Sequence, residues 1–577
     1  MNLFKKLALA MIVLSVAACT DLDELLENPN GVDPSRADAV SLYNSIQLNF
    51  RNIANSQTMY RFTAGLARMN GEIGGFTYQA THGPTEFNIL WNDVYADLFP
   101  DVDAFIALAE PVGLDTEAAS AKIMKAYTLM LLVDLFGDVP NSEATQGANP
   151  DNQILNPTRD SGEEVYAAAN ALLDEAIAQL EGSSGFGSAA FDNFYGGNAS
   201  GWSTLAKTLQ IRSAVTTRLA NGSAASTINS ILDGGDFISS NNQNFEWQYG
   251  NNRANPDNRH PFYSNVYEAN DGQYMANWYM WLLAESKGFP DPRTRYYFFR
   301  QETDIVGAYT DNPNAFDCIF TAVPDPEFLP AHYEAVSEDM PYCLGSYDRG
   351  YFGRDHLNGS GIPPDGNLRT IYGLYPGGGK FDDGISNGDA QQNGTLGAQG
   401  AGIAPLFQAS FTHFMLAEAA LTLGTNGDAR DLLQAGIELS LDRVRAFESL
   451  VDGGEQIAAA PPVDVFVENT FPVDSNFTQY VDFVMDEYDD ADDDGKLGIV
   501  AREFLIALYG NGIEAYNLYR RTCMPGDIQP AIDPNPGPFI RSALYPADHV
   551  NLNQNVDQKG SFTEPVFWDT NDASCNY

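Results

Sequence analysis

Basic residues are scarce in this sequence. Its 577 residues include 31 lysines and arginines against 77 aspartates and glutamates, which gives a formal net charge of −46. Such a chain lacks the basic surface that neutralises a phosphate backbone, so nucleic acid is excluded as a partner. Anionic lipid surfaces and polyanionic ligands are disfavoured for the same electrostatic reason. The plainest role of the charge is to keep the protein soluble.

Long apolar runs are missing as well. Beyond the N-terminal leader, no segment approaches the roughly 18 apolar residues that cross a bilayer. Hydrophobic residues make up 44% of the chain and aromatic residues 12%, which excludes an intrinsically disordered protein. The length predicts about two to four domain-sized units, or one large fold with insertions.

Motifs of catalysis are a third absence. The six histidines are scattered, without a His-Glu-x-x-His pair for zinc, and no Gly-x-Ser-x-Gly elbow occurs. The segment Gly377–Lys380 is similar to a phosphate-binding loop, but Phe381 replaces the Ser or Thr, which indicates a simple turn. Paired carboxylates for glycoside hydrolysis stay open, because 77 acidic residues supply any spacing by chance. Nothing positive in the sequence indicates an enzyme.

The first residues carry an export signal. Lys5 and Lys6 precede an apolar stretch, 7–16, that is too short to span a bilayer, and Ala17-Ala18-Cys19 follows. A cysteine at this place is the arrangement of a bacterial lipobox, in which the thiol is acylated and begins the mature chain. We expect residues 1–18 to be a signal peptide and Cys19 to carry the lipid. An ordinary signal peptide with a chance cysteine is the alternative.

Four other cysteines occur, Cys318, Cys343, Cys523 and Cys575. An even number in an exported chain predicts disulfides, and four cysteines allow three pairings. Proximity in the sequence favours Cys318–Cys343 and Cys523–Cys575, and the second bond would pin the C-terminal tail to the end of a helix. No Cys-x-x-Cys spacing occurs, which argues against a thiolate zinc site.

Apolar residues recur at three- and four-residue spacing in two parts of the chain, which predicts helices. After a helical region at 41–110 with a Gly- and Thr-rich interruption at 71–83, we expect helices at 118–136, 162–180, 202–219, 404–423, 428–449, 475–488 and 498–522. Asp160 or Ser161 is the expected cap of the second of these helices. Short loops separate the helices in pairs, which is typical of tetratricopeptide-type hairpins.

Between residues 220 and 400 this periodicity fails, apart from a helical run at about 276–286. A loop-rich stretch of this length is usually functional. The predicted fold is therefore mainly α. Tetratricopeptide-like helix pairs form a scaffold at about 41–220 and 404–525, and a loop-rich, ligand-facing insert at about 221–403 holds short helices and small β elements. Residues 19–40 are expected to form a flexible tether, and 526–577 a C-terminal tail.

Several segments also occur in a characteristic order. They are Ala121–Tyr127 with Leu135–Ala144, Tyr195–Trp202 with Gln210–Arg212, Asp291–Arg293, Gly350–His356 with Gly361–Asp365 and Tyr375–Asp382, Gly512–Thr522 with Pro525, and Ile540-Arg541 with Tyr545-Pro546. Together with the lipobox, this ordered set resembles the SusD/RagB family of nutrient-binding outer-membrane lipoproteins, in particular its branch with a Gly-Arg-Asp-His motif. The acidic residues Asp21, Asp23 and Glu24 resemble the export signal of surface lipoproteins in the Bacteroidetes. Cys523 stands where the family usually has glycine, which fits an added disulfide.

The resemblance implies that residues 41–577 form one SusD-like domain at the outer membrane and cell surface, attached by the lipid alone. It implies capture rather than conversion: the protein would bind a nutrient oligomer, glycan or peptide, and deliver it to a SusC-like TonB-dependent transporter. A lipid-anchored secreted hydrolase, either glycosidase or peptidase, is one alternative, and a purely structural surface lipoprotein is another. No cofactor is required by this reading.

One metal site is suggested by alternating acids. Asp490, Asp492 and Asp494 match the first half of an EF-hand loop, and Lys496 would supply a backbone carbonyl. The position of the bidentate acid is occupied by Ala501, so the loop pattern is broken. A structural Ca²⁺ that stiffens the turn between two helices is one interpretation, and a solvated acidic loop is the other.

Candidate ligand contacts come from aromatic residues, because sugar rings and peptide side chains both favour exposed aromatic surfaces. One loop holds Tyr78 and Trp91, and another holds Tyr274, Trp278 and Trp281 at helical spacing. We expect these five side chains to contact the ligand, and Tyr78 foremost, because its Gly- and Thr-rich surroundings offer little to pack against. The alternative is that they belong to the core.

Overall fold

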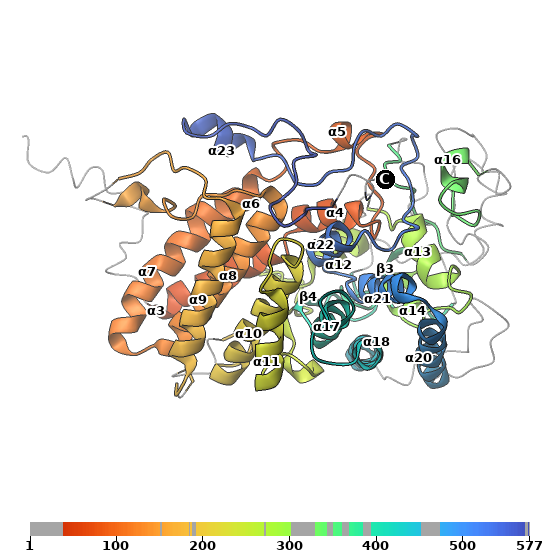
Figure 1. Ribbon diagram of the computed structural model, residues 1–577, viewed down its shortest axis with the longest axis horizontal. Coiled ribbons are helices and arrows are strands. Elements are labelled where there is room, and N and C mark those ends of the chain that lie inside the picture. Colours follow the sequence, from red (N-terminus) through yellow and green to blue (C-terminus); the bar gives the residue numbers. More distant parts are fainter. Residues whose placement is uncertain are drawn as a thin grey trace, which may run out of the picture.

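Helices build most of the protein (Figure 1). The computed structural model describes residues 39–149, 153–183, 185–186, 192–269, 273–301, 329–342, 350–359, 369–384, 394–451, 473–571 and Cys575. One group of helices lies side by side at one end of the molecule: α3 (Ala39–Ala54), α7 (Phe99–Ala109), α8 (Asp115–Phe136), α9 (Gly162–Leu180), α10 (Ala199–Thr216) and α11 (Ala224–Gly234). Helix α8 packs against α9, α9 against α10, and α10 against α11, as in a stack of helix hairpins.

A second group of helices comes from the C-terminal half of the chain. It contains α17 (Ala409–Leu423), α18 (Ala429–Arg445), α20 (Val473–Asp490), α21 (Asp493–Ala507) and α22 (Gly512–Thr522). Helix α10 packs against α17, and α4 (Gln57–Leu66) packs against α22, so the two groups are continuous although they are distant in sequence. The predicted mainly α scaffold is therefore confirmed.

Local sequence signals set several helix ends. Helix α9 spans the predicted residues, and Ser161 is its cap: the Ser161 hydroxyl accepts a hydrogen bond from the Glu164 N–H, while the Glu164 carboxylate accepts one from the Ser161 N–H. This reciprocal arrangement satisfies two N–H groups that have no partner within the helix. Helix α8 ends before Gly137, whose φ of 81° only glycine adopts easily.

Two predicted helices are wrong in their bounds. The segment expected to begin a helix at residue 404 is strand β4 (Ile403–Phe407), which pairs antiparallel with β1 (Phe245–Gln248). The segment 498–522 is not one helix, because Gly510 has a φ of 97° and a Cβ there would lie 2.8 Å from Pro376 Cγ. Contacts with distant parts of the chain cause both the strand at 403–407 and the interruption at Gly510. The spacing of apolar residues within a segment carries no information about such contacts.

The loop-rich insert holds short elements, as predicted. They include α12 (Pro261–Tyr263), α13 (Asn277–Ala284), α14 (Thr294–Tyr297), α16 (Ala331–Glu334) and a two-stranded pairing of β2 (Phe298–Phe299) with β3 (Ile371–Tyr372). Other short helices are α5 (Tyr78–Thr81), α6 (Asn88–Asn92) and α23 (Ala547–Leu552). Two π-helical turns are η2 (Asp93–Leu98) and η7 (Ser264–Glu268). The 3₁₀ turns are η3 (Glu110–Val112), η4 (Gln146–Ala148), η6 (Asn241–Gln243) and η10 (Ala446–Leu450). In the described part of the chain, no helix is long and apolar enough to cross a membrane.

Buried ion pairs hold the insert to the scaffold and hold scaffold helices to one another. Arg293 donates to Asp291 Oδ2 at 2.6 Å and to Glu503 Oε2 at 2.9 Å, and none of the three side chains is exposed. Arg521 of α22 donates from Nε to Glu418 Oε1 of α17 at 2.8 Å. Losing one partner would leave a buried charge uncompensated, so these pairs hold the loops in one arrangement.

Candidate ligand-binding region

The five aromatic side chains predicted to contact ligand are all buried. The exposed fractions are 1% for Tyr78, 7% for Trp91, 1% for Tyr274, 0% for Trp278 and 8% for Trp281. The prediction that they form exposed platforms is therefore wrong in this structure. Two of them have bonded polar ends inside the protein: the Tyr78 hydroxyl lies 3.1 Å from Nε2 of His356, and the indole N–H of Trp278 donates to the Asp527 carbonyl at 3.0 Å.

Tyr78 is buried because the Gly-Arg-Asp-His motif, 353–356, folds over it. The Tyr78 hydroxyl lies 3.1 Å from Nε2 of His356. Asp355 Oδ1 accepts hydrogen bonds from Asn277 at 2.9 Å and from Gln529 at 3.0 Å. The motif thus joins three segments that are far apart in the sequence, which makes it a structural hub rather than a ligand platform.

Glycine and arginine complete this hub. A Cβ on Gly353 would lie 2.1 Å from the Met275 carbonyl oxygen, so no larger residue fits. The Arg354 guanidinium lies over the ring of Tyr274, 4.8 Å from its centroid. A cation over an aromatic face is attracted by the negative charge density of the ring, which explains why Tyr274 is covered.

A buried pair of histidines shares one carboxylate beside the hub. His82 Nε2 lies 2.9 Å from Glu72 Oε1, and His356 Nδ1 lies 3.5 Å from Glu72 Oε2. Burial alone would lower the pKa of His82, but Glu72 and Glu86 raise it to about 10. Burial lowers the pKa of His356 well below its usual range, and the charges of Arg68 and His82 lower it further. The cluster therefore holds one charged and one neutral histidine at neutral pH.

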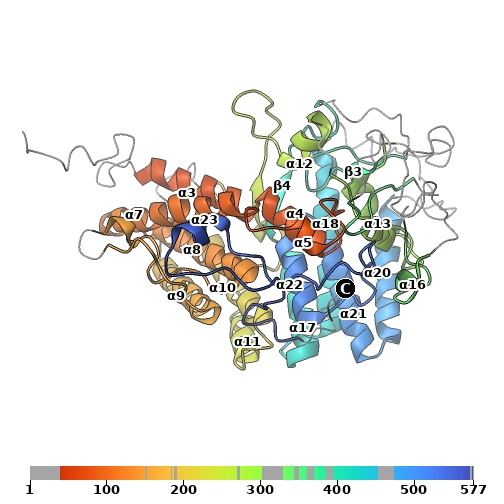
Figure 2. The ribbon, with the colours of Figure 1, turned by 90° about the horizontal axis from the view of Figure 1, so that it is seen from above.

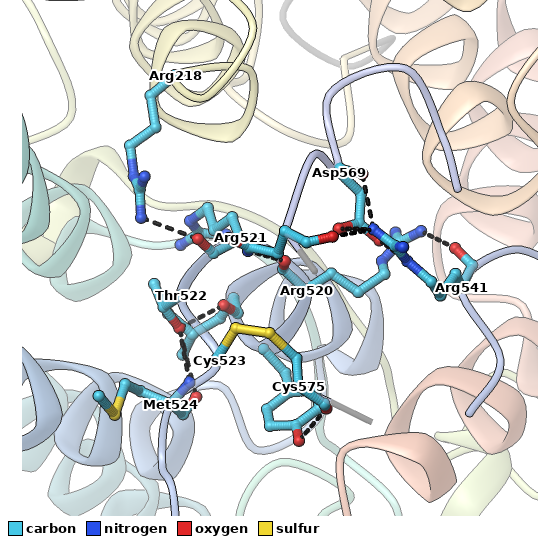
Figure 3. Close-up of a disulfide and its surroundings, with 12 residues drawn as sticks. Arg218, Arg520, Arg521, Thr522, Cys523, Met524, Arg541, Asp569 and Cys575 are labelled. Atoms are coloured by element: carbon cyan, nitrogen blue, oxygen red, sulfur yellow. Dashed lines mark hydrogen bonds and ion pairs between the residues drawn. A yellow bond between two sulfur atoms is a disulfide. The ribbon is translucent and has the colours of Figure 1, made fainter. Parts of the chain in front are cut away.

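The C-terminal tail is fastened by the disulfide Cys523–Cys575, which confirms that predicted pairing (Figure 3). Cys523 ends α22 with a φ of 58°, the left-handed conformation in which glycine is common at a helix end. Asn571 of the tail donates to the Arg520 carbonyl of α22 at 2.7 Å, and Arg541 pairs with Asp569 Oδ1 within the tail at 2.7 Å. Cys318, Cys343 and the predicted lipid site Cys19 lie outside the described residues.

The acidic segment predicted to bind calcium begins a helix instead of forming an EF-hand loop. Asp492 caps α21 by accepting a hydrogen bond from the Gly495 N–H at 2.9 Å, and both Asp494 and Lys496 lie within that helix. Among the described residues, no group of three or more His, Cys, Asp or Glu side chains could hold a metal ion. The expected loop geometry is therefore wrong, whereas calcium binding itself stays a prediction.

The described part of the protein has several surface depressions, and three of them are well formed. One of about 540 Å³ lies between α16 and the Pro-rich segment 526–537, and its lining includes His332 and Pro536. One of about 570 Å³ lies over α10 between α9 and α11, and Ser, Thr, Asn and Gln dominate its lining. A third of about 390 Å³ lies between α18 and α20. None of them is lined by a residue that the sequence singled out for ligand binding.

An aromatic cluster that the sequence did not reveal lies where β1 meets the end of α3. Trp247 of β1 is partly exposed, and Tyr249 follows it on the same face of the strand. The Arg51 guanidinium of α3 lies 5.1 Å from the Trp247 ring centroid and 5.5 Å from that of Tyr249. The Tyr249 hydroxyl accepts a hydrogen bond from Asn55 at 2.9 Å. A strand pattern at 245–249 could have predicted that both rings share one face, but not that α3 lies against them.

Two family models match most of the chain. The first, described as "Starch-binding associating with outer membrane", matches residues 31–325, and the second, described as "Susd and RagB outer membrane lipoprotein", matches residues 371–556. None of the curated proteins matches the chain.

Solved structures of the same family share the fold. A SusD/RagB family protein from Bacteroides thetaiotaomicron is 18% identical, with a TM-score of 0.62, and the match covers 93% of this chain and 100% of the other. A protein titled "Bacteroidetes AC2a SusD-like" is 17% identical, with a TM-score of 0.63 over 93% of this chain and 100% of its own. A protein titled "chitin-binding protein" is 19% identical, with a TM-score of 0.60 over 92% and 100%. At these identities the structures show a common fold, and the first family model alone matches more than half of the sequence. The chain belongs to the SusD/RagB family of outer-membrane lipoproteins.

Proposed function

We propose that this protein is a surface-exposed lipoprotein that binds a nutrient oligomer and delivers it to a TonB-dependent outer-membrane transporter. The observation that carries the proposal is the match of two family models to residues 31–325 and 371–556, together with a shared fold over more than nine-tenths of the chain. A glycan is the favoured ligand, because one family model is described as starch-binding and one similar structure is titled as chitin-binding.

Ligand titration tests the binding role. The full chain, kept in detergent, would be titrated calorimetrically with maltoheptaose, chitohexaose and a mixture of short peptides. Saturable heat with one oligosaccharide is expected, and saturable heat with peptides alone would make the ligand a peptide. Products released during a long incubation would favour the alternative of a lipid-anchored hydrolase. No binding to any member of this panel would favour a structural lipoprotein.

The transporter partner can be tested separately from the ligand. A SusC-like barrel should co-purify with an affinity-tagged copy of the protein from detergent-solubilised outer membranes of its own host. A tagged outer-membrane lipoprotein of another family is the control. Recovery of the tagged protein without any TonB-dependent barrel would contradict this part of the proposal.

Cys19 is proposed as the lipid-bearing residue. In the variant Cys19→Ala no thiol is available for acylation, so the protein should leave the membrane fraction. Cys523→Ser, which keeps the export signal, is the control and should stay bound to membranes. A Cys19→Ala protein that sediments with the membranes after a high-salt wash would show that the anchor lies elsewhere.

Calcium is proposed as a structural ion at the start of α21. Asp490, Asp492 and Asp494 are close in sequence, and a cation would offset the repulsion between their charges. Melting at low ionic strength should then shift to a lower temperature after EGTA treatment and return with added Ca²⁺. The variant Asp490→Asn/Asp494→Asn should lose this response, and an unchanged wild-type midpoint would remove calcium from the protein.

A further inference from the structure

Trp247 differs from the other tryptophans of this protein. All six lie in the described part of the chain, and five of them, Trp91, Trp202, Trp278, Trp281 and Trp568, are at most 8% exposed. Trp247 is partly exposed on β1, with one edge packed against Phe194 at 5.5 Å between ring centroids. An aromatic ring that keeps part of its surface in water while its edge is held in place is suited to contact a flat ligand.

The second unusual feature is the cation beside it. The chain has 77 acidic residues and only 31 lysines and arginines, so most cations could find an acidic partner. Nevertheless, no hydrogen bond or ion pair joins the Arg51 guanidinium to another residue in the described part of the chain. Nε of Arg51 is buried without a hydrogen-bond partner. The guanidinium also carries four N–H donors on Nη1 and Nη2, which are not buried, so a ligand that accepts hydrogen bonds from these two atoms would gain affinity here.

Amide side chains dominate the surroundings of the pair. Asn52 is exposed, Asn55 is partly exposed, and the exposed loop 251–258 holds further asparagines. This loop projects from the molecule near β4 and α12 (Figure 2). Amide side chains both donate and accept hydrogen bonds, which matches the hydroxyl groups of a sugar.

The acidic residues near this surface already have partners. Asp257 pairs with Arg259 at 2.5 Å, and Glu268 pairs with Arg253 at 2.9 Å. Glu246 is the neighbour of Trp247 but points to the other face of β1, where it pairs with Arg443 at 2.6 Å. One unpaired guanidinium in a chain of net charge −46 does not attract a polyanion, so the surface suits a neutral ligand better than an acidic one.

We infer that Arg51, Trp247 and the amides around them form a subsite for one pyranose ring of a neutral oligosaccharide. The apolar face of the sugar contacts the Trp247 ring, and the guanidinium and the side chain of Asn55 bond to its hydroxyl groups. This inference rests on the proposed function, in that the protein must bind a glycan at all. The subsite is built on a helix and a paired strand, which fix its geometry before the ligand arrives.

Substitutions test the subsite in the full chain, with maltoheptaose and chitohexaose as probes. Trp247→Ala and Arg51→Ala should each weaken binding of the active probe by about tenfold or more, since the stacking surface or the donors are lost. Trp247→Phe keeps an aromatic ring and should lose less affinity for the probe than Trp247→Ala. Arg430→Ala removes an arginine from a surface ion pair far from β1 and is the matched control, expected to bind as the wild type does. Equal melting temperatures for the variants would confirm that they fold.

Fluorescence gives a second readout that needs no variant. Trp247 should be the tryptophan that acrylamide quenches most, because the other five are buried. A saturating probe should protect it, and the binding constant should change little between 50 mM and 500 mM NaCl because a neutral sugar carries no charge to screen.

The outcomes separate the two proposals. If neither oligosaccharide binds the wild type, the proposed glycan binding fails, and the subsite fails with it. If one binds but Trp247→Ala binds it equally well and quenching is unchanged, the protein captures glycans elsewhere and only the subsite is wrong. Binding that weakens steeply with salt would overturn the assignment of a neutral ligand.

Discussion

Arg212 lies without exposed surface between two carboxylates of distant helices. Its Nη2 is 2.6 Å from Asp134 Oδ2 on α8, and its Nε is 2.5 Å from Glu514 Oε1 on α22. The two carboxylates raise the pKa of Arg212 against the opposing effect of burial, so the guanidinium stays charged. Replacing it with methionine would leave two buried negative charges without a partner. We expect Arg212→Met to lower the free energy of unfolding by about 3–5 kcal/mol, measured by urea denaturation.

A surface ion pair is the control for this prediction. Arg430 and Asp489 also form a two-point contact, at 2.7 Å, but both side chains are well exposed. Water screens such a pair, so Arg430→Ala should leave the unfolding midpoint unchanged. Equal losses in the two variants would mean that burial does not set the strength of the Arg212 pairs.

His82 should make stability depend on pH above neutrality. Its pKa rises from 6.5 to about 10 in the folded protein, where burial opposes the charge but Glu72 and Glu86 favour it. Because the folded-state pKa is raised, the contribution of the bound proton is fully present below about pH 6.5 and is lost as the pH rises through about 10. Melting temperatures between pH 6 and pH 10.5 should therefore fall more steeply for the wild type than for His82→Gln.

His549 is the matched control for this pH dependence. Burial and the charge of Arg159 lower the pKa of His549 to about 4, so it does not titrate in the same window. The variant His549→Gln should keep the wild-type slope between pH 6 and pH 10.5. A wild-type slope in His82→Gln would show that the carboxylates around His82 do not hold its proton.

At the scale of elements, the disulfide joins the end of α22 to the C-terminal tail across 52 residues of chain. Closing a loop of this length restricts the unfolded chain more than the folded one. The double variant Cys523→Ser/Cys575→Ser should therefore lose about 2–4 kcal/mol of unfolding free energy. Reductant should lower the denaturation midpoint of the wild type toward that of the variant. A midpoint that is the same with and without both cysteines would show that noncovalent contacts such as that of Asn571 with the Arg520 carbonyl suffice to hold the tail.

Elements with a strong local signal could be predicted from the sequence, and those that depend on distant partners could not. Helix α9 has its capping box within its own residues, and its bounds agree with the prediction. Strand β4 exists because β1, far earlier in the chain, supplies its hydrogen bonds, and its apolar residues looked like the start of a helix. The break between α21 and α22 at Gly510 depends in the same way on distant residues, because Pro376 and Pro405 leave no room for a side chain at this position.

The candidate site shows the same limit over the whole molecule. The sequence revealed aromatic residues in loops, but whether a ring is exposed depends on segments hundreds of residues away. Tyr78 is covered by His356 and by the neighbouring motif, and Trp278 by Asp527. Trp247 lies on a short strand of the predicted insert, and only the packing of α3 against that strand brings Arg51 to it. The ordered motifs could identify the family because order along the chain is a property of sequence, whereas a ligand site is a property of packing.

The charge of the whole molecule leads to a last prediction. The chain has 77 acidic residues against 31 basic ones, and some of the basic residues are held in buried pairs, so we expect net repulsion between the surface acids. Raising the salt from about 50 mM to 1 M shortens the screening length to roughly 3 Å, which weakens repulsion across the surface while leaving buried pairs largely unaffected. The melting temperature should rise with NaCl and rise equally with KCl, since screening depends on ionic strength and not on the kind of monovalent ion. A melting temperature that falls with salt would mean that surface ion pairs, rather than acidic repulsion, dominate the electrostatics of the fold.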